Sequence, residues 1–387
     1  MPALTDPIPL LQALVRAPSV TPETAGVLDI LEKALTALGF SVERPVFSGD
    51  GSYTVENLFA IRDRGGKRLL LAGHTDVVPP GDLEKWTRDP FSGAISDGVL
   101  FGRGAADMKS GLAAMVAAIA RMAESGADEA GTLALLITND EEADAINGTD
   151  KLLAWATERG HSFDFAVVGE PSATAEVGDV IRIGRRGSVS YRITVSGKQG
   201  HVAYPDKALN PLPALSRIGA ALSGTPLDAG TAHFPPSSLQ LTSIDVGNPT
   251  SNVIPAQGSL RFNIRFNDLW TPEALDGWVK AQIAKAEPGS AGVSVDRLGR
   301  PSRVFRAPVE GPVVLLIETI KARTGRAPEL STGGGTSDGR FIAAYCPVVE
   351  LGLPGPTMHQ VNEQVRIADV EALTALYEAF FSRYLKG

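Results

Sequence analysis

A short apolar run, RLLLAGHTD at residues 68–76, predicts a buried β-strand that ends beside side chains able to bind a metal ion. Two further runs have the same character, TLALLIT at 132–138 and FDFAVV at 163–168. Between the first two, apolar residues recur at helical spacing from Met108 to Glu124. Strands that alternate with helices predict an α/β domain built on a mostly parallel sheet.

The pattern changes near Gly178. Residues 180–198 alternate apolar and polar side chains, which is typical of an antiparallel sheet with one solvated face. Helical and strand-like segments follow, and near Pro301 the chain returns to helix, strand and a final helix. We therefore predict a smaller α+β domain, residues 180–296, inserted into a larger α/β domain formed by residues 1–179 and 297–387.

The composition excludes several classes of protein. The 387 residues include 44 acidic and 36 basic side chains, a net charge of −8, which argues against nucleic-acid binding. No run approaches 18 consecutive apolar residues, and the first residues lack the pattern of a signal peptide, so we expect no membrane association and a cytoplasmic protein. The one cysteine, Cys346, excludes internal disulfides and cysteine-based metal clusters.

Several side chains able to bind a metal ion closely follow the strand-like runs. They are His74 and Asp76 after the first run, Glu141 and Glu142 after the second, Glu170 after the third, His359 after a later run, and Asp107 at the start of the predicted helix. In open α/β sheets, ligands bind beyond the carboxyl ends of the strands. We therefore expect these groups to meet at one edge of the sheet.

The residue types indicate which metal such a site would hold. Imidazole and carboxylate donors without thiolate suit Zn²⁺, and also Co²⁺ or Mn²⁺. A single catalytic zinc takes about three protein ligands, so this larger set favours two ions that share one carboxylate, for which Asp107 is the best candidate. Ordinary explanations stay open: an isolated histidine is often solvated, Glu141 and Glu142 can form a solvated turn, and an aspartate at a helix start is often an N-cap.

Six motifs follow one another along the chain: GHTDVVPPG (73–81), GRGAADMKSG (102–111), TNDEE (138–142), GEPS (169–172), GKQGHVAYP (197–205) and MHQVNE (358–363). In this order they resemble the motifs of the two-zinc amidohydrolases that include aminoacylases, acetylornithine deacetylases and succinyl-diaminopimelate desuccinylases. Two further stretches, GRRGS (184–188) and STGGGTSDGRF (331–341), resemble the desuccinylase branch of that family.

The resemblance implies a two-metal site. One Zn²⁺ would be held by His74, Asp107 and Glu170. A second Zn²⁺ would be held by Asp107, Glu142 and His359, and Co²⁺ is an alternative in either site.

The resemblance also implies the catalytic groups. Asp76 would orient the His74 ring, because residues i and i+2 of a strand point the same way. Glu141 would be the general base. His201, in the inserted domain, would donate a hydrogen bond to the developing oxyanion, usually in the site of the neighbouring subunit. The inserted domain would thus act as a lid and as the interface of a homodimer.

Substrate binding is implied for Arg185, Ser188, Asn252 and the loop residues Gly334, Gly335 and Thr336. The substrate of the desuccinylase branch carries three carboxylates, and an arginine can bind one of them through two parallel hydrogen bonds. A glycine-rich run can present several backbone N–H groups to an anion. Without the resemblance, Arg185 is also consistent with a solvated strand face and the glycine run with a flexible turn.

The reaction implied is metal-dependent hydrolysis of the amide bond of N-succinyl-LL-2,6-diaminopimelate to succinate and LL-2,6-diaminopimelate, in lysine and diaminopimelate biosynthesis. An acetylornithine deacetylase or a general N-acyl-amino-acid hydrolase is the alternative with the same chemistry; Arg185 and the glycine run discriminate between them. A third interpretation is a non-catalytic metal- or peptide-binding relative. The presence of Glu141 argues against it, because a binding protein needs the ligands but not the base.

Overall fold

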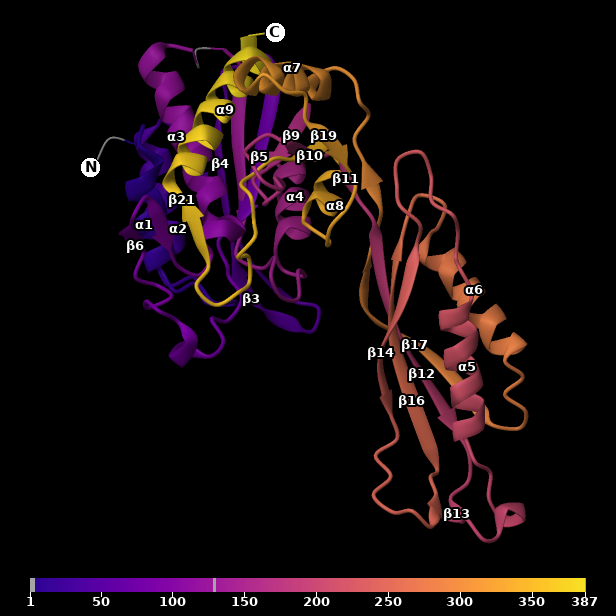
Figure 1. Cartoon of the computed structure of the whole chain (residues 1–387). Coiled ribbons are helices and arrows are strands. Elements are labelled where there is room, and N and C mark those ends of the chain that lie inside the picture. Colours follow the sequence, from indigo (N-terminus) through magenta and orange to yellow (C-terminus); the bar gives the residue numbers. More distant parts are fainter. Residues whose placement is uncertain (1–3, 128–129, 387) are drawn as a thin grey trace. The chain divides into compact units, whose positions relative to one another are not determined.

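The computed structural model describes residues 4–127 and 130–386, and the chain divides into two compact units (Figure 1). Unit 1 comprises the residues up to Gly184, Arg306–Ser331 and the residues from Ser337 onward. Unit 2 comprises Arg185–Phe305 and Thr332–Thr336. Each unit has a hydrophobic core of its own, as expected for separately packed layers of secondary structure.

Unit 1 is built on an eight-stranded sheet with the strand order β1-β4-β8-β5-β9-β20-β10-β19. The strands β8, β5, β9 and β20 lie next to one another and run parallel. The bounds are Ser41–Glu43 (β1), Leu58–Arg62 (β4), Thr132–Thr138 (β8), Arg68–His74 (β5), Phe165–Val168 (β9), Val348–Glu350 (β20), Val180–Arg182 (β10) and Glu329–Ser331 (β19). The predicted α/β fold with a mostly parallel sheet is confirmed.

Helices cover both faces of this sheet. One face carries α1 (Pro7–Arg16), α2 (Val27–Ala37), α3 (Ser110–Ser125), α7 (Pro312–Thr324) and α9 (Ile367–Lys386), which share a hydrophobic core with Leu58 and Ala60 of β4. The intervening Phe59 packs edge-on against Trp155 of α4 (Thr149–Glu158), and α4 contacts α8 (Gly339–Ile342). Successive side chains of a strand point to opposite faces, so α4 and α8 cover the second face.

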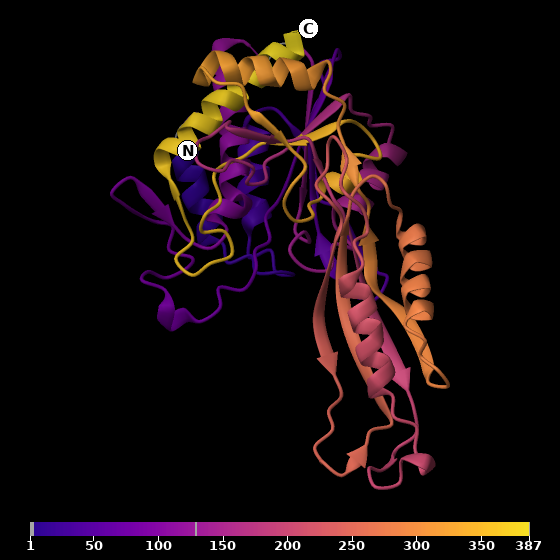
Figure 2. The same ribbon diagram turned by 45° about the vertical axis from the view of Figure 1, so that its right-hand side comes forward.

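Unit 2 contains a four-stranded antiparallel sheet in the order β14-β16-β12-β17. Its strands are Ser238–Asp245 (β14), Gln257–Phe266 (β16), Gly187–Ser196 (β12) and Gly292–Ser302 (β17). The helices α5 (Leu212–Gly224) and α6 (Pro272–Lys285) lie on one face of the sheet and share its core (Figure 2). Side chains along β12 alternate between buried and half-buried, so the predicted strand with one solvated face is confirmed there.

The bounds of unit 2 differ from the predicted insert of residues 180–296. Residues 180–182 form β10 in the sheet of unit 1, and β17 extends to Ser302. The apolar–polar alternation runs on across the junction and therefore hides the break before β12. At that break Gly187 leaves no room for a side chain, because a Cβ would lie 2.2 Å from the Phe266 ring. We therefore place the inserted segment at residues 185–305.

The remaining elements are short. They are β2 (Val46–Gly49) with β3 (Ser52–Glu56), β21 (Gln364–Arg366) with β7 (Val99–Phe101) and β6 (Ala94–Ser96), β13 (Gly200–His201) with β15 (Val253–Ile254), and helical turns at Leu83–Lys85, Ala105–Lys109 and Pro205–Lys207. The chain passes between the units at β11 (Gly184–Arg185) and β18 (Phe305–Arg306), and again on either side of Thr332–Thr336. In residues 4–127 and 130–386, no helix is both long and apolar enough to cross a membrane.

Candidate metal centre

The predicted metal-binding residues lie at the carboxyl edge of the four parallel strands. His74 is the last residue of β5, Glu142 follows β8 and Glu170 follows β9. His359 lies in the long connection between β20 and β21. The carboxyl ends of neighbouring parallel strands share one edge of a sheet, so segments far apart in the sequence deliver their side chains to the same place.

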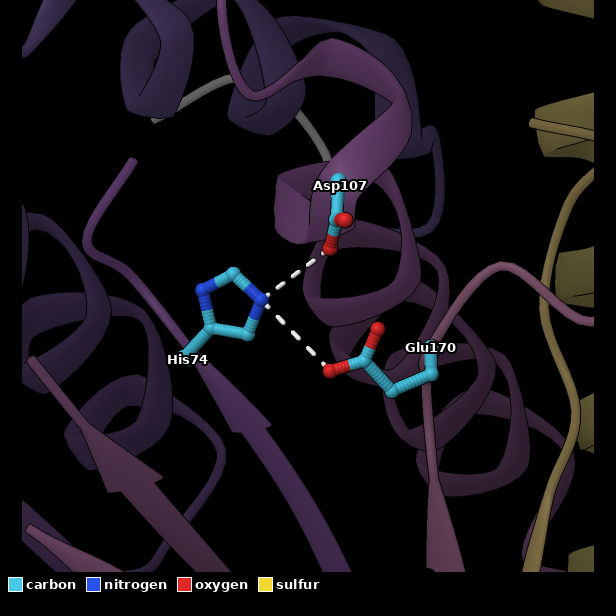
Figure 3. A group of neighbouring side chains, drawn as sticks. All are labelled: His74, Asp107 and Glu170. Atoms are coloured by element: carbon cyan, nitrogen blue, oxygen red, sulfur yellow. Dashed lines mark hydrogen bonds and ion pairs between the residues drawn. The ribbon is translucent and has the colours of Figure 1, made fainter. Parts of the chain in front are cut away.

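His74, Asp107 and Glu170 form the first of two potential ligand groups (Figure 3). His74 Nε2 lies 3.1 Å from Asp107 Oδ1 and 3.6 Å from Glu170 Oε1. All three residues are buried, and one donor atom from each lies within 4.8 Å of the other two. Three nitrogen and oxygen donors that converge in this way are a suitable set for one divalent cation.

Asp107, Glu142 and His359 form the second group. His359 Nε2 lies 3.0 Å from Glu142 Oε1 and 3.3 Å from Asp107 Oδ2. The two oxygens of Asp107 are therefore divided between the groups, Oδ1 toward His74 and Oδ2 toward His359. This division is the arrangement expected of a carboxylate that bridges two metal ions.

The backbone around Asp107 differs from the predicted helix start. The helix α3 begins at Ser110, not Met108, and Asp107 lies in the preceding irregular turn with an extended backbone conformation (φ −121°, ψ 102°). None of the described side chains caps the N-terminus of α3. The N-cap explanation for Asp107 is therefore wrong: its side chain points instead to the two histidines.

The His74 ring is oriented differently from the way the resemblance implied. Its Nδ1 lies 2.8 Å from the backbone carbonyl oxygen of Asp76, whereas the nearer carboxylate oxygen is 3.6 Å away. A carbonyl only accepts hydrogen bonds, so Nδ1 carries a proton and Nε2 is the nitrogen that faces Asp107 and Glu170 and is available to a metal ion. The backbone of Asp76, rather than its carboxylate, thus sets the tautomer that a metal ligand requires.

The Asp76 carboxylate instead holds the loop that carries Glu141 and Glu142. It is fully buried and accepts hydrogen bonds from the backbone N–H of Glu141 (3.2 Å) and of Glu142 (3.1 Å). It also accepts a hydrogen bond from the Thr21 hydroxyl at 2.8 Å. One carboxylate therefore joins the end of β5 to the loop after β8.

The electrostatics of the cluster fit a pair of bound cations. Although burial opposes a charged imidazole, Asp107, Glu170 and Asp76 hold the pKa of His74 well above its usual range. Hydrogen bonds to Asp107 and Glu142 raise the pKa of His359 to about 10. Burial and neighbouring carboxylates raise the pKa of Glu170 well above its usual range. Crowded, buried carboxylates favour a nearby positive charge, and bound divalent metal ions would supply that charge.

Glu141 belongs to neither ligand group among the described residues, although it is next to Glu142. Burial, together with the negative charges of Asp338, Glu142 and Asp107, raises its pKa well above the usual range, with His74 opposing the shift. The side chains of adjacent loop residues can point in different directions. Glu142 can therefore bind a metal ion while the Glu141 carboxylate exchanges a proton.

Two predicted substrate-binding elements lie together in unit 2. Arg185 Nη1 lies 3.4 Å from the carbonyl oxygen of Gly333 and 3.5 Å from that of Gly335, in the loop that also contains Gly334 and Thr336. Gly334 has a positive φ of 97°, which favours glycine. Ser188, at the start of β12, accepts a hydrogen bond from Asn263 at 3.0 Å.

His201 and Asn252 form a second pair in unit 2. The backbone N–H of Val202 donates to the carbonyl oxygen of Asn252 at 3.1 Å, and both His201 and Asn252 are exposed. Eight residue steps of β12 separate Ser188 from Ser196 at the far end of the strand, which is about 26 Å of extended chain. His201 lies beyond that far end, so one copy of unit 2 cannot bring His201 and Ser188 to the same small molecule.

Sequence inspection overlooked two residues near Glu141, the half-buried Thr21 and the buried Asp338. Thr21 is one; no motif pointed to it, because it lies in an N-terminal loop and acts through Asp76. Asp338 is the other; it is buried, and its charge contributes to the raised pKa of Glu141. Asp338 does belong to the stretch STGGGTSDGRF, where only the glycine run was interpreted.

Comparison with known proteins agrees with this geometry. The model of the family "Peptidase family M20/M25/M40" matches residues 70–383. A curated relative from Methylobacterium nodulans, "Succinyl-diaminopimelate desuccinylase", is 51% identical over 388 aligned positions, covering 100% of this chain and 98% of the relative. The predicted resemblance to the desuccinylase branch is confirmed.

Solved structures show the same fold at low sequence identity. An M20 family metallo-carboxypeptidase from Sulfolobus solfataricus matches with a TM-score of 0.79 at 17% identity, covering 99% of this chain and 100% of that one. The YXEP protein of Bacillus subtilis, described as a dinuclear metal-binding peptidase from the M20 family, matches with a TM-score of 0.70 at 15% identity, covering 99% and 98%. With two ligand groups at the edge of its sheet, this chain belongs to the metal-dependent hydrolases of peptidase family M20/M25/M40.

Proposed function

We propose that this protein hydrolyses the amide bond of N-succinyl-LL-2,6-diaminopimelate, releasing succinate and LL-2,6-diaminopimelate for lysine and diaminopimelate biosynthesis in the cytoplasm. One observation carries the proposal of metal-assisted hydrolysis. Asp107 belongs to two ligand groups, one with His74 and one with His359. Glu141, which is in neither group among the described residues, directly precedes the proposed ligand Glu142 in the chain. The substrate is supported by the name of the relative that is 51% identical along the whole chain.

Zn²⁺ is the metal that we propose for both groups, with Co²⁺ as the alternative. His74, Asp107 and Glu170 would hold one ion, and Asp107, Glu142 and His359 the other. Imidazole and carboxylate donors without thiolate are compatible with either metal. When bound, the two ions would polarise the amide carbonyl and lower the pKa of a water molecule.

Glu141 acts as the general base and then as the general acid in this proposal. It accepts the proton of the attacking water and returns it to the amide nitrogen as the carbon–nitrogen bond breaks. Its position is set by its own backbone N–H, which the buried Asp76 carboxylate holds at 3.2 Å. Because Asp76 also accepts a hydrogen bond from the backbone N–H of Glu142, one carboxylate anchors the residues that supply the base and a metal ligand.

Arg185 and the loop Gly334–Thr336 bind the carboxylates of the substrate. The guanidinium contacts the carbonyl oxygens of Gly333 and Gly335, so the cation lies against the glycine-rich backbone. Arginine suits this task because its planar group donates two parallel hydrogen bonds to a carboxylate. Ser188 and Asn252 complete the proposed set of substrate-binding residues.

A homodimer formed through the inserted segment would complete the site. His201 lies beyond the end of β12 opposite to Ser188, more than about 26 Å of strand away, so in this proposal a second subunit supplies the His201 that donates to the substrate carbonyl oxygen. His201 is exposed, and its Nδ1 accepts a hydrogen bond from the backbone N–H of Ala203 at 3.1 Å. That contact leaves Nε2 protonated and free to donate.

A comparison of two substrates tests the proposal. Protein loaded with Zn²⁺ or Co²⁺ is assayed with N-succinyl-LL-2,6-diaminopimelate and with N-acetyl-L-ornithine. We expect kcat/KM for the succinyl substrate to be at least about 100-fold higher, since a site built around buried polar groups discriminates strongly against a substrate that leaves them unpaired. Equal or greater activity on acetylornithine would support the alternative deacetylase, and no hydrolysis of either would contradict both.

A further inference from the structure

A buried ion pair lies in unit 1 outside both ligand groups. Arg103 Nη1 is 2.5 Å from Glu363 Oε2, and the two side chains are 2% and 0% exposed. Both residues belong to motifs that also contain a proposed metal ligand, Arg103 to the motif of Asp107 and Glu363 to the motif of His359. Neither residue has a role in the reaction as described so far.

Glu363 holds the backbone of the turn that carries Asp107. Its Oε1 accepts hydrogen bonds from the backbone N–H of Ala106 at 2.8 Å and of Asp107 at 3.2 Å. Its own backbone carbonyl oxygen accepts a hydrogen bond from the N–H of Gly102 at 2.9 Å. Because Asp107 lies in an irregular turn before α3, these contacts replace the support that a regular helix would give.

Arg103 connects the same pair to the segment that carries His359. Its Nη2 lies 3.4 Å from the backbone carbonyl oxygen of His359 and 3.4 Å from that of Pro79. His359 has a left-handed backbone conformation (φ 62°), and its side chain is 45% exposed. An exposed side chain on such a turn has little packing to fix it, so the position of its ring depends on how the backbone is held.

The first ligand group has supports of its own. His74 ends the central strand β5, is 1% exposed, and has its Nδ1 fixed by the carbonyl oxygen of Asp76 at 2.8 Å. Glu170 follows the neighbouring strand β9 and is buried. Two of the three ligands in this group therefore do not depend on the Arg103–Glu363 pair, whereas two of the three ligands in the second group are in segments that the pair holds.

We infer that Arg103 and Glu363 are positioning residues that set the affinity of the second group, Asp107, Glu142 and His359, for its metal ion. The inference rests on the proposed function to the extent that both groups bind metal. The pair anchors the turn of Asp107 and the turn of His359 to each other, so it fixes the distance between the two ligands. Loss of the pair loosens the second group and leaves the first close to its normal geometry.

Metal titration of near-isosteric variants tests the inference. Metal-free wild type, Glu363→Gln and Arg103→Lys are titrated with Zn²⁺ against a chromophoric chelator and with Co²⁺ while the visible absorption spectrum is recorded. We expect two binding events in the wild type. In each variant one event weakens about 10- to 100-fold, as is usual for residues that orient metal ligands, and the other stays within about threefold. Arg103→Lys keeps the charge but loses the planar group that reaches two carbonyls and a carboxylate.

Two controls separate positioning from a general loss of structure. Glu371→Gln removes the ion pair between Arg121 and Glu371 (2.7 Å), in which the Glu371 side chain is 53% exposed. This change should leave the affinities of both metal-binding events unchanged. The variant His359→Ala lacks the imidazole of the second group. Adding Glu363→Gln to it should change the metal affinity of the first group by less than about threefold. A cooperative thermal unfolding transition shows that each metal-free variant is folded. If Glu363→Gln does not fold, the metal affinities of Arg103→Lys test the inference instead.

The outcomes are distinguishable. Wild-type affinities at both events in Glu363→Gln and Arg103→Lys would overturn the inference, and so would an equal weakening of both events. A wild-type protein that binds no Zn²⁺ or Co²⁺ would contradict the proposed function as well, whereas two normal wild-type events with unaffected variants would contradict only the role of the ion pair.

Discussion

Gly111 lies where the backbone of α3 passes closest to the residue before Glu170, and we expect Gly111→Ala to damage the first ligand group. A Cβ at this position would lie 2.4 Å from the carbonyl oxygen of Gly169, 3.1 Å from its carbonyl carbon and 3.2 Å from its Cα. All three atoms belong to the backbone, so no side-chain rotation relieves the contact. The helix that follows Asp107 and the strand exit that carries Glu170 would have to move apart.

The size of the effect follows from these distances. Real Cβ contacts do not fall below 3.0 Å, so the two backbones must separate by at least 0.6 Å, the difference between 2.4 Å and 3.0 Å. Metal–ligand distances tolerate about 0.2 Å. Overpacking costs about 1–3 kcal/mol, and alanine gains about 0.5–1 kcal/mol over glycine within a helix, which leaves a net loss of about 0–2.5 kcal/mol in the free energy of unfolding.

Urea unfolding of the metal-free protein and titration with Zn²⁺ measure the two consequences. We expect Gly111→Ala to lose up to about 2.5 kcal/mol of stability and about tenfold or more in affinity for one ion. Gly277→Ala is the matched control, because Gly277 is an exposed position of α6 with no atom within 4 Å of the added Cβ. It should gain about 0.5–1 kcal/mol. A Gly111→Ala protein that is stabilised like the control and binds metal normally would refute the reasoning.

Further expectations concern the catalytic and substrate-binding residues. Glu141→Gln should lower kcat about 100- to 10,000-fold while metal content stays at the wild-type level, because Glu141 is in neither ligand group; normal turnover would remove it as the base. Arg185→Ala should lower kcat/KM for the succinyl substrate about 10- to 100-fold and affect acetylornithine far less, and an equal loss on both would contradict its role. Mixed dimers of inactive His201→Ala and inactive Glu141→Gln subunits should regain activity, since one site of each mixed dimer has both groups intact; confirmed mixed dimers without activity would show that His201 does not act across subunits.

Local sequence patterns were sufficient for the architecture of unit 1 and for the candidate ligands. The apolar runs that became β5, β8 and β9 are short and flanked by turn residues, so their burial in a parallel sheet is readable from composition. The ligands follow these runs directly, and the rule that sites form at the carboxyl ends of parallel strands then places them together. Both inferences rest on properties of a few neighbouring residues.

Local patterns misplaced features that depend on contacts between distant segments. The start of α3 was predicted two residues early, because helical spacing does not reveal that the backbone at Asp107 is extended. The bounds of the inserted segment were placed too early, because the apolar–polar alternation continues through the break before β12.

The chemistry around His74 shows the same limit. A carboxylate two residues away suggested that the Asp76 side chain orients the ring, whereas the backbone carbonyl oxygen of Asp76 makes that contact and its carboxylate holds the loop of Glu141. Which oxygen faces the imidazole depends on the fold of the loop after β8, about 65 residues further along the chain.

From the amino-acid order alone came the α/β class, the family and the identity of the seven acidic and imidazole side chains, because strand burial, helical period and motif spacing are all written in short segments. The tertiary structure added what those side chains do to one another: Asp107 divides its oxygens between two histidines, and Glu363 joins a turn 256 residues away from it in the chain. Such pairings depend on the packing of segments that are remote in sequence, and no local pattern encodes them.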